Sequence, residues 1–151
     1  MTGSGTALVA SSISAVVAMA VVGLQYSLER RRQQRADRAQ RLAAFFAATH
    51  AFVLYLGPLA RAPLAKKEQI LAEARDLEDR LSACFAQVRL LEDREIVDAA
   101  TRLDRELVRL EGRAREKQWS RTDWREARAG LSEPVSTYQA LARKKLGAGR
   151  L

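Results

Sequence analysis

The chain has 151 residues, of which 48% are hydrophobic and 29% charged, and it carries a formal net charge of +8. Its length predicts one domain, and its abundant Leu, Ala, Arg and Glu predict an all-α fold, since no alternating β-branched run bounded by turns suggests a strand. The single cysteine, Cys84, excludes an internal disulfide and gives no sign of secretion.

The first predicted element is a membrane helix. Thr6–Tyr26 is uncharged and mostly apolar, and at a rise of about 1.5 Å per residue a helix of this length crosses the roughly 30 Å core of a bilayer. No basic residue precedes this segment and no small-residue cleavage site follows it, which argues against a secretory signal peptide. We therefore predict a transmembrane helix over residues 6–28, after a short extracytoplasmic N-terminus at residues 1–5.

An Arg-rich juxtamembrane collar, residues 29–41, comes next. Its arginines are Arg30, Arg31, Arg32, Arg35, Arg38 and Arg41. Because the N-terminal flank has no Lys or Arg, the positive-inside rule places the N-terminus outside the cell membrane and the rest of the chain in the cytoplasm. The collar is also positioned to contact anionic lipid head groups. It lacks interleaved aromatic residues, so we do not expect it to bind nucleic acid.

Small residues recur along one side of the predicted membrane helix. They include Ala7, Ser11, Ala15 and Gly23. Small side chains at this spacing let two membrane helices approach closely, so this side is a candidate contact in a homo-oligomer. The alternative is that the spacing reflects only the Ala-rich composition of the segment.

Residues 42–60 form a second uncharged stretch, and its interpretation decides the topology of the chain. His50 lies near the middle, where a polar group in lipid is expensive. Gly57 and Pro58 are expected to end the helix after Leu56, which leaves it short for a membrane span. The larger apolar residues recur at three- and four-residue spacing, as in an amphipathic helix of a soluble core. We favour the core helix, and a second span stays open as the alternative.

Two heptad seams follow a predicted turn at residues 57–65. The first is Ile70, Ala74, Leu77, Leu81, Cys84, Val88 and Leu91, and the second is Ile96, Ala100, Leu103, Leu107, Leu110 and Ala114. The heptad phase breaks between the seams, and Asp93 can cap a new helix, so we favour a hairpin of helices 66–91 and 95–118 over one continuous helix. The seams are expected to pack within the bundle, and pairing with another chain is the alternative.

A last helix is expected to begin at Ser120 or Thr122, either of which can cap it, and to be interrupted near Pro134. With the preceding helices it completes an antiparallel bundle of about four helices over residues 42–146. A frayed, Gly-rich tail is expected at residues 147–151.

The sequence contains no phosphate-binding loop, dinucleotide fingerprint or paired metal-ligand motif. His50 has no Cys, Asp or Glu at ligand spacing, so we expect a core residue rather than a ligand. We expect no enzymatic activity, cofactor or metal. The pattern favours a non-enzymatic interaction or scaffolding module, anchored by one pass at the cytoplasmic membrane face, with a protein partner that the sequence does not identify. The alternative is a two-span hairpin that acts as a small pore-forming or membrane-perturbing effector.

Overall fold

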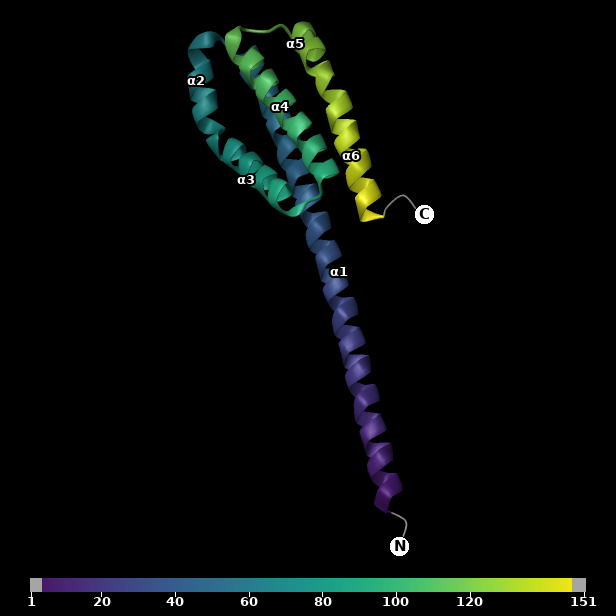
Figure 1. Cartoon of the computed structure of the whole chain (residues 1–151). Helices are drawn as coiled ribbons and strands as arrows, with labels where there is room; N and C mark the ends of the chain where they lie inside the picture. The colour runs from purple at the N-terminus through teal and green to yellow at the C-terminus, as the bar shows by residue number, and fades with distance from the viewer. Residues whose placement is uncertain (1–3, 148–151) are drawn as a thin grey trace. The chain divides into compact units, whose positions relative to one another are not determined.

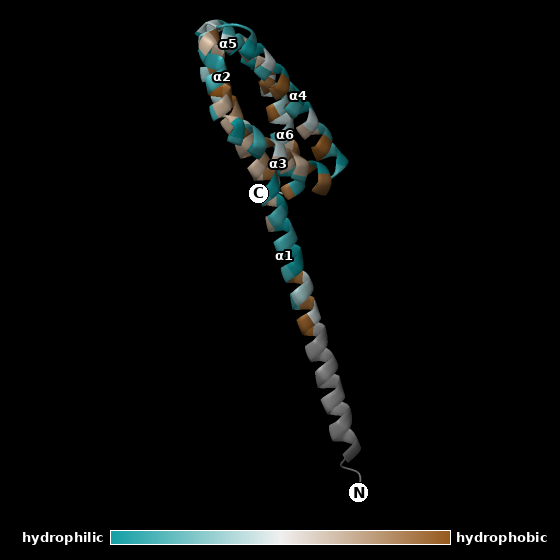
Figure 2. Ribbon diagram, turned by 90° about the vertical axis from the view of Figure 1, so that its left-hand side faces the viewer, coloured by the Kyte–Doolittle hydropathy of each residue, from teal (hydrophilic) through white to brown (hydrophobic). Residues whose placement is uncertain are grey.

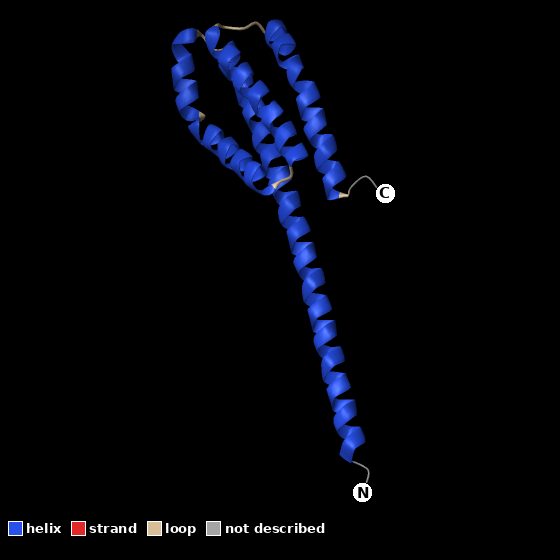
Figure 3. Ribbon diagram, in the orientation of Figure 1, coloured by secondary structure: helices blue, strands red, loops and turns tan. Residues whose placement is uncertain are grey.

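The computed structural model describes the backbone of residues 4–147 and the side chains of residues 21–147. Within this part of the chain all regular structure is helical, which confirms the all-α prediction (Figure 3). The elements are α1 (Ser4–Arg61), α2 (Leu64–Glu73), α3 (Arg75–Leu91), α4 (Arg94–Glu116), α5 (Arg121–Arg128), the 3₁₀ helix η1 (Ala129–Leu131) and α6 (Ser132–Leu146) (Figure 1).

The chain divides into two compact units whose boundary falls inside α1. The first unit ends at Arg38 and the second begins at Ala39, within the predicted collar. In the first unit the side chains from Val21 to Asp37 are exposed. Such exposure is expected of a lone helix, whose backbone hydrogen bonds are satisfied within the helix itself.

The described chain contains one helix that is long and apolar enough to cross a membrane, judged by length and composition alone. This is Val21–Arg61, with a mean hydropathy of 1.6 over its most apolar window, of which 39% is buried by the protein. The arginine collar interrupts the first half of this range, so the window falls on residues 42–60. The predicted membrane helix, residues 6–28, lies largely outside the residues whose side chains are described.

The core of the second unit forms on the apolar face of α1. The large apolar side chains on this face that are at most 3% exposed are Leu42, Phe45, Phe52, Leu56 and Leu59. They belong to one cluster with the second heptad seam, all of whose members are buried on α4, as predicted. Figure 2 shows hydrophobic and hydrophilic positions interspersed along these helices, as amphipathic packing requires. Burying each large apolar side chain contributes roughly 1.5–3 kcal/mol.

Helix α1 continues through Gly57 and Pro58 to Arg61, so the prediction that it ends after Leu56 is wrong. Proline lacks the N–H that would bond to the carbonyl of Leu54. Leu54 lies on the solvent side, with 59% of its surface exposed, where water can satisfy the freed carbonyl. The Arg61 Nε also donates a hydrogen bond back to the Gly57 carbonyl at 3.2 Å. The chain turns only after Arg61.

A buried lysine, Lys67, joins α2 to the C-terminal ends of α1 and α4. Its Nζ donates to the carbonyls of Leu59 (2.9 Å) and Ala60 (3.3 Å) on α1, and to those of Ala114 and Lys117 (2.8 Å) at the end of α4. Helix C-termini carry unpaired carbonyls and partial negative charge, which an ammonium group complements. Burial lowers the pKa of Lys67, while the four carbonyls favour its charged form.

The first heptad seam lies on two helices rather than on the single predicted helix 66–91. The chain bends at Ala74, where φ is −93° and ψ is 0°. No Gly or Pro stands in this range, so the local sequence does not signal the bend. The bend leaves α2 beside the helix ends that Lys67 joins, while α3 packs along α4. Leu91, the last residue of the seam, is exposed, so the buried seam ends at Val88.

Two predicted helix caps are present in the structure. Asp93 caps α4 by accepting a hydrogen bond from the Ile96 N–H at 3.3 Å, so α3 and α4 form the hairpin that the sequence favoured. Ser120 caps α5 by accepting from the Asp123 N–H at 3.1 Å. The predicted interruption of the last helix occurs at η1, just before Pro134, which lies in the first turn of α6.

Helix α6 packs along α4 and also binds α1 directly. The hydroxyl of the buried Tyr138 donates to the Leu42 carbonyl at 3.1 Å, and burial raises the pKa of this phenol. Its ring meets the Phe45 ring edge-on, with the centroids 5.2 Å apart. The hydrogen bond joins residues 96 positions apart in the chain, and the two contacts together fix α6 against the start of the α1 core.

Candidate functional site

A groove of about 390 Å³ lies between α1 and the segment formed by α5, η1 and α6. We call it the α1/α6 groove. One wall is Phe46, Thr49, His50 and Val53, and the other is Arg125, Arg128, Ala129, Leu131, Ser132 and Val135. Apolar side chains supply much of both walls, whereas His50, Arg125 and Arg128 are exposed at its edge. The groove is therefore apolar inside and cationic at its opening.

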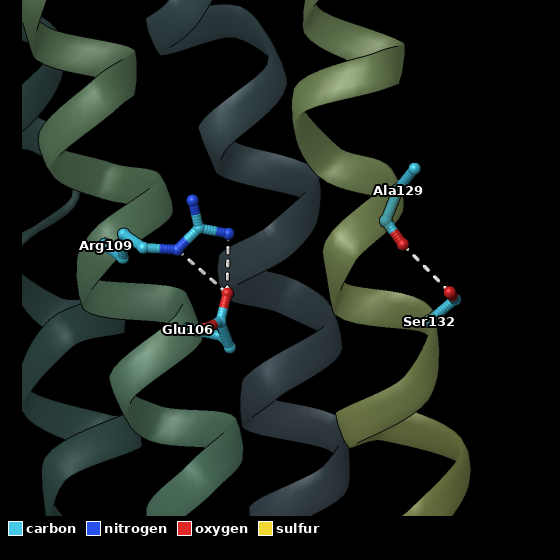
Figure 4. A network of polar contacts seen from close by, with 4 residues as sticks. All are labelled: Glu106, Arg109, Ala129 and Ser132. Atoms are coloured by element: carbon cyan, nitrogen blue, oxygen red, sulfur yellow. Dashed lines mark hydrogen bonds and ion pairs between the residues drawn. The ribbon is translucent and has the colours of Figure 1, made fainter.

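The turn that forms one wall of the groove is held by a local hydrogen bond. The Ser132 hydroxyl donates to the Ala129 carbonyl at 2.8 Å, which links the start of α6 to η1 (Figure 4). On α4, Arg109 binds Glu106 through Nε (2.9 Å) and a terminal nitrogen (2.6 Å), so this arginine already has an acidic partner.

A second compartment, of about 300 Å³, shares Arg125 and Arg128 with the α1/α6 groove. We call it the Arg–Trp pocket. It is lined by Gly57, Arg61, Arg121, Trp124, Arg125 and Arg128. A Cβ at Gly57 would lie 4.0 Å from both the Trp124 indole nitrogen and the Arg61 guanidinium, which is ordinary van der Waals contact. Four arginines and one tryptophan therefore line this small pocket.

None of these four arginines forms an ion pair with an acidic side chain among the described residues, whereas Arg102, Arg109 and Arg115 do. Four like charges around a small pocket repel one another, and an anion between them would relieve that repulsion. The arrangement therefore has the chemistry of a site for carboxylate or phosphate oxygen atoms, which guanidinium groups bind through paired N–H donors.

Each compartment also contains a buried polar atom with no hydrogen-bond partner among the described residues. These are the Thr49 Oγ1 in the groove and the Trp124 Nε1 in the pocket. The two residues are 2% and 5% exposed. Buried side-chain polar atoms are paired in the large majority of cases, and an unpaired one typically costs about 1–3 kcal/mol. Each compartment is therefore lined by a residue whose buried polar atom has no partner among the described residues.

Among the residues whose side chains are described, the site residues predicted from sequence do not line either compartment. Arg30, Arg31, Arg32 and Arg35 are exposed in the first unit. Arg38 is half-buried, and Arg41 forms an ion pair at 3.2 Å with the buried Glu92 carboxylate. Gly23 is exposed, and a Cβ there would meet no atom within 4 Å. Ala7, Ser11 and Ala15 lie outside the residues whose side chains are described.

His50 is exposed on the groove wall, so the prediction that it is a core residue is wrong. It directly follows the buried Thr49, and the rotation of about 100° per residue in a helix carries it past the edge of the core. The described residues include no group of three His, Cys, Asp or Glu side chains that could hold a metal. Cys84 is half-buried and packs against the core on α3.

The sequence pattern missed the Arg–Trp pocket, although a local signal exists. Arg121, Arg125 and Arg128 recur at four- and three-residue spacing, which places them on one side of a helix. Nothing local predicts that Arg61 joins them. No protein-family model, curated protein sequence or solved structure matches this chain.

Proposed function

We propose that the chain is a single-pass membrane-anchored interaction module. Residues 6–28 cross the cell membrane with the N-terminus outside, and the helical bundle docks a protein partner at the cytoplasmic face. The observation that carries this proposal is the burial of the apolar face of residues 42–60 in the bundle. That face is used in protein packing and is not free to face lipid, which leaves residues 6–28 as the remaining apolar segment.

Polar contacts at both ends of residues 42–60 favour the same conclusion. Tyr138 binds the Leu42 carbonyl at one end, and Lys67 binds the Leu59 and Ala60 carbonyls at the other. A second membrane span would have to break these contacts or carry a lysine and a tyrosine hydroxyl into hydrocarbon, where unpaired polar groups cost several kcal/mol each. The bundle keeps both contacts.

The arginine collar supports an orientation with the N-terminus outside the cell and the bundle in the cytoplasm. The exposed guanidinium groups of Arg30, Arg31, Arg32 and Arg35 follow the predicted membrane helix directly. Each basic group near an anionic membrane surface contributes about 1 kcal/mol of attraction. This asymmetry supports placing the collar, and the bundle after it, on the cytoplasmic side.

Cysteine labelling in intact cells tests the topology. In a Cys84→Ala background, we expect Thr2→Cys to react with a membrane-impermeant thiol reagent, and Ala140→Cys, at an exposed position on α6, to react only after lysis. Labelling of both sites on the same side would contradict one span and favour the two-span hairpin. Recovery of the chain in the soluble fraction would contradict the anchor itself.

A further inference from the structure

We propose that the α1/α6 groove and the Arg–Trp pocket together bind an acidic amphipathic helix of a protein partner. This inference rests on the proposed function and specifies the partner surface. The partner helix places apolar side chains against the groove and carboxylates against the four arginines of the pocket. This site is separate from the buried heptad seams and from the arginine collar.

The shape of the site suits a helix. Along α1, a single stripe runs from Phe46 through His50, Val53 and Gly57 to Arg61, at three- and four-residue spacing. At a rise of about 1.5 Å per residue this stripe is about 22 Å long, or roughly four helical turns. Two helix walls with a groove between them are the geometry in which a third helix buries its apolar face.

The lining residues change from apolar to cationic along the site, from Phe46 toward Arg61. At the Phe46 end, the adjacent Phe45 packs against Tyr138 of α6, and the large apolar lining residues Phe46, Val53, Leu131 and Val135 belong to this groove and not to the Arg–Trp pocket. Gly57 and Arg61 face the other end, where Arg121 and Arg125 lie. A complementary helix therefore carries apolar anchors in one half of its contact face and carboxylates in the other.

The unpaired polar atoms of Trp124 and Thr49 indicate which groups of the partner helix would lie against them. The indole Nε1–H of Trp124 can only donate, so its partner must be an acceptor. A carboxylate in the pocket can bind the neighbouring guanidinium groups of Arg125 and Arg128, since its two oxygens offer about four acceptor positions. For the same carboxylate to accept from the Trp124 N–H, which is closed off from solvent, the indole ring would have to shift toward the pocket. The hydroxyl of Thr49 can donate or accept within the apolar half.

A helix fits the site better than a small anionic amphiphile does. Small-molecule sites typically enclose 70–90% or more of the surface of the ligand. Here His50 and the two arginines Arg125 and Arg128 are exposed along the groove, so the opening faces solvent. A partner helix needs only one buried face and keeps the other in water.

Photo-crosslinking from the groove in the native cells tests the inference. A photoreactive residue replaces Val53 on the groove wall in the full chain, and the matched control replaces Val108, an exposed position on α4 that lines neither compartment. We expect an adduct from position 53, with the crosslinked peptide mapping to an acidic amphipathic helix, and at least about tenfold less adduct from position 108.

Charge reversal provides the second readout. Arg125→Glu with Arg128→Glu is expected to lower the adduct yield from position 53 about tenfold or more, because both carboxylates would then repel the acidic partner. Arg80→Glu with Arg105→Glu makes the same change in net charge at exposed positions on α3 and α4 outside the groove, and it should leave the yield unchanged.

The outcomes separate this inference from the proposed function. A non-acidic crosslinked segment, a second copy of this chain, a lipid adduct, or no adduct from position 53 would each overturn the groove proposal. An adduct to a protein from position 108 alone would also overturn it, while retaining an interaction module that docks elsewhere. Failure of the membrane topology would instead appear in the cysteine labelling.

Discussion

Lys67→Met is expected to lower the free energy of unfolding of the bundle by about 2–4 kcal/mol. Methionine keeps most of the volume of the side chain but removes the ammonium group, so the carbonyls of Ala114 and Lys117 lose this donor in a buried place. The carbonyls of Leu59 and Ala60 lose it too, but they keep the backbone N–H groups of Ala62 and Trp119 as partners. Each unsatisfied buried acceptor typically costs about 1–3 kcal/mol, part of which water would recover. Urea unfolding of the full chain in detergent, followed by circular dichroism, measures the loss.

The neighbouring residue supplies a matched control. Lys66 is exposed, and Lys66→Met should change the free energy of unfolding by no more than about 0.5 kcal/mol. An equal decrease in the free energy of unfolding for Lys66→Met and Lys67→Met would mean that the charge of Lys67 does not hold the helix ends together. A loss confined to Lys67→Met would identify it as the polar contact between the ends of α1 and α4.

Leu56→Lys is expected to unfold the bundle, whereas Leu54→Lys should be almost neutral. Leu56 is fully buried in the core, so an unpaired ammonium there would cost more than about 4 kcal/mol. Leu54 is 59% exposed, and a lysine there reaches water, so we expect a change within about 0.5 kcal/mol. Unfolding curves of the two variants, measured under identical conditions, give the comparison.

The pair discriminates between the two interpretations of residues 42–60. In a membrane span both positions would lie in hydrocarbon, where a lysine near the centre costs about 2.5–3.5 kcal/mol by insertion measurements. Similar losses for Leu54→Lys and Leu56→Lys would therefore support a span. A large difference between them would support the one-sided burial that the bundle requires.

Local signals made part of this fold predictable. The seam from Ile96 to Ala114 is buried throughout because a heptad pattern specifies one helix face. The caps at Asp93 and Ser120 form because their side chains need only backbone groups three residues away. Such features depend on a few neighbouring residues, which the sequence presents directly.

Features that depend on distant residues were not predictable. Pro58 ends many helices, yet here α1 continues because the freed carbonyl of Leu54 lies at the solvent side. The bend at Ala74 has no Gly or Pro signal and accompanies the position of Lys67 between two helix ends. The Arg–Trp pocket needs Arg61 from α1 beside three arginines of α5, and no sequence spacing states that pairing.

The most direct test of the account is the water accessibility of residues 42–60. In a Cys84→Ala background, Leu54→Cys, Leu56→Cys and the exposed control Ala140→Cys are each treated with a hydrophilic maleimide in opened membranes. If these residues pack in the bundle, positions 54 and 140 react rapidly and position 56 stays protected until the protein is denatured. Protection of position 54 together with position 56, while position 140 still reacts, would place the stretch in lipid and contradict the account.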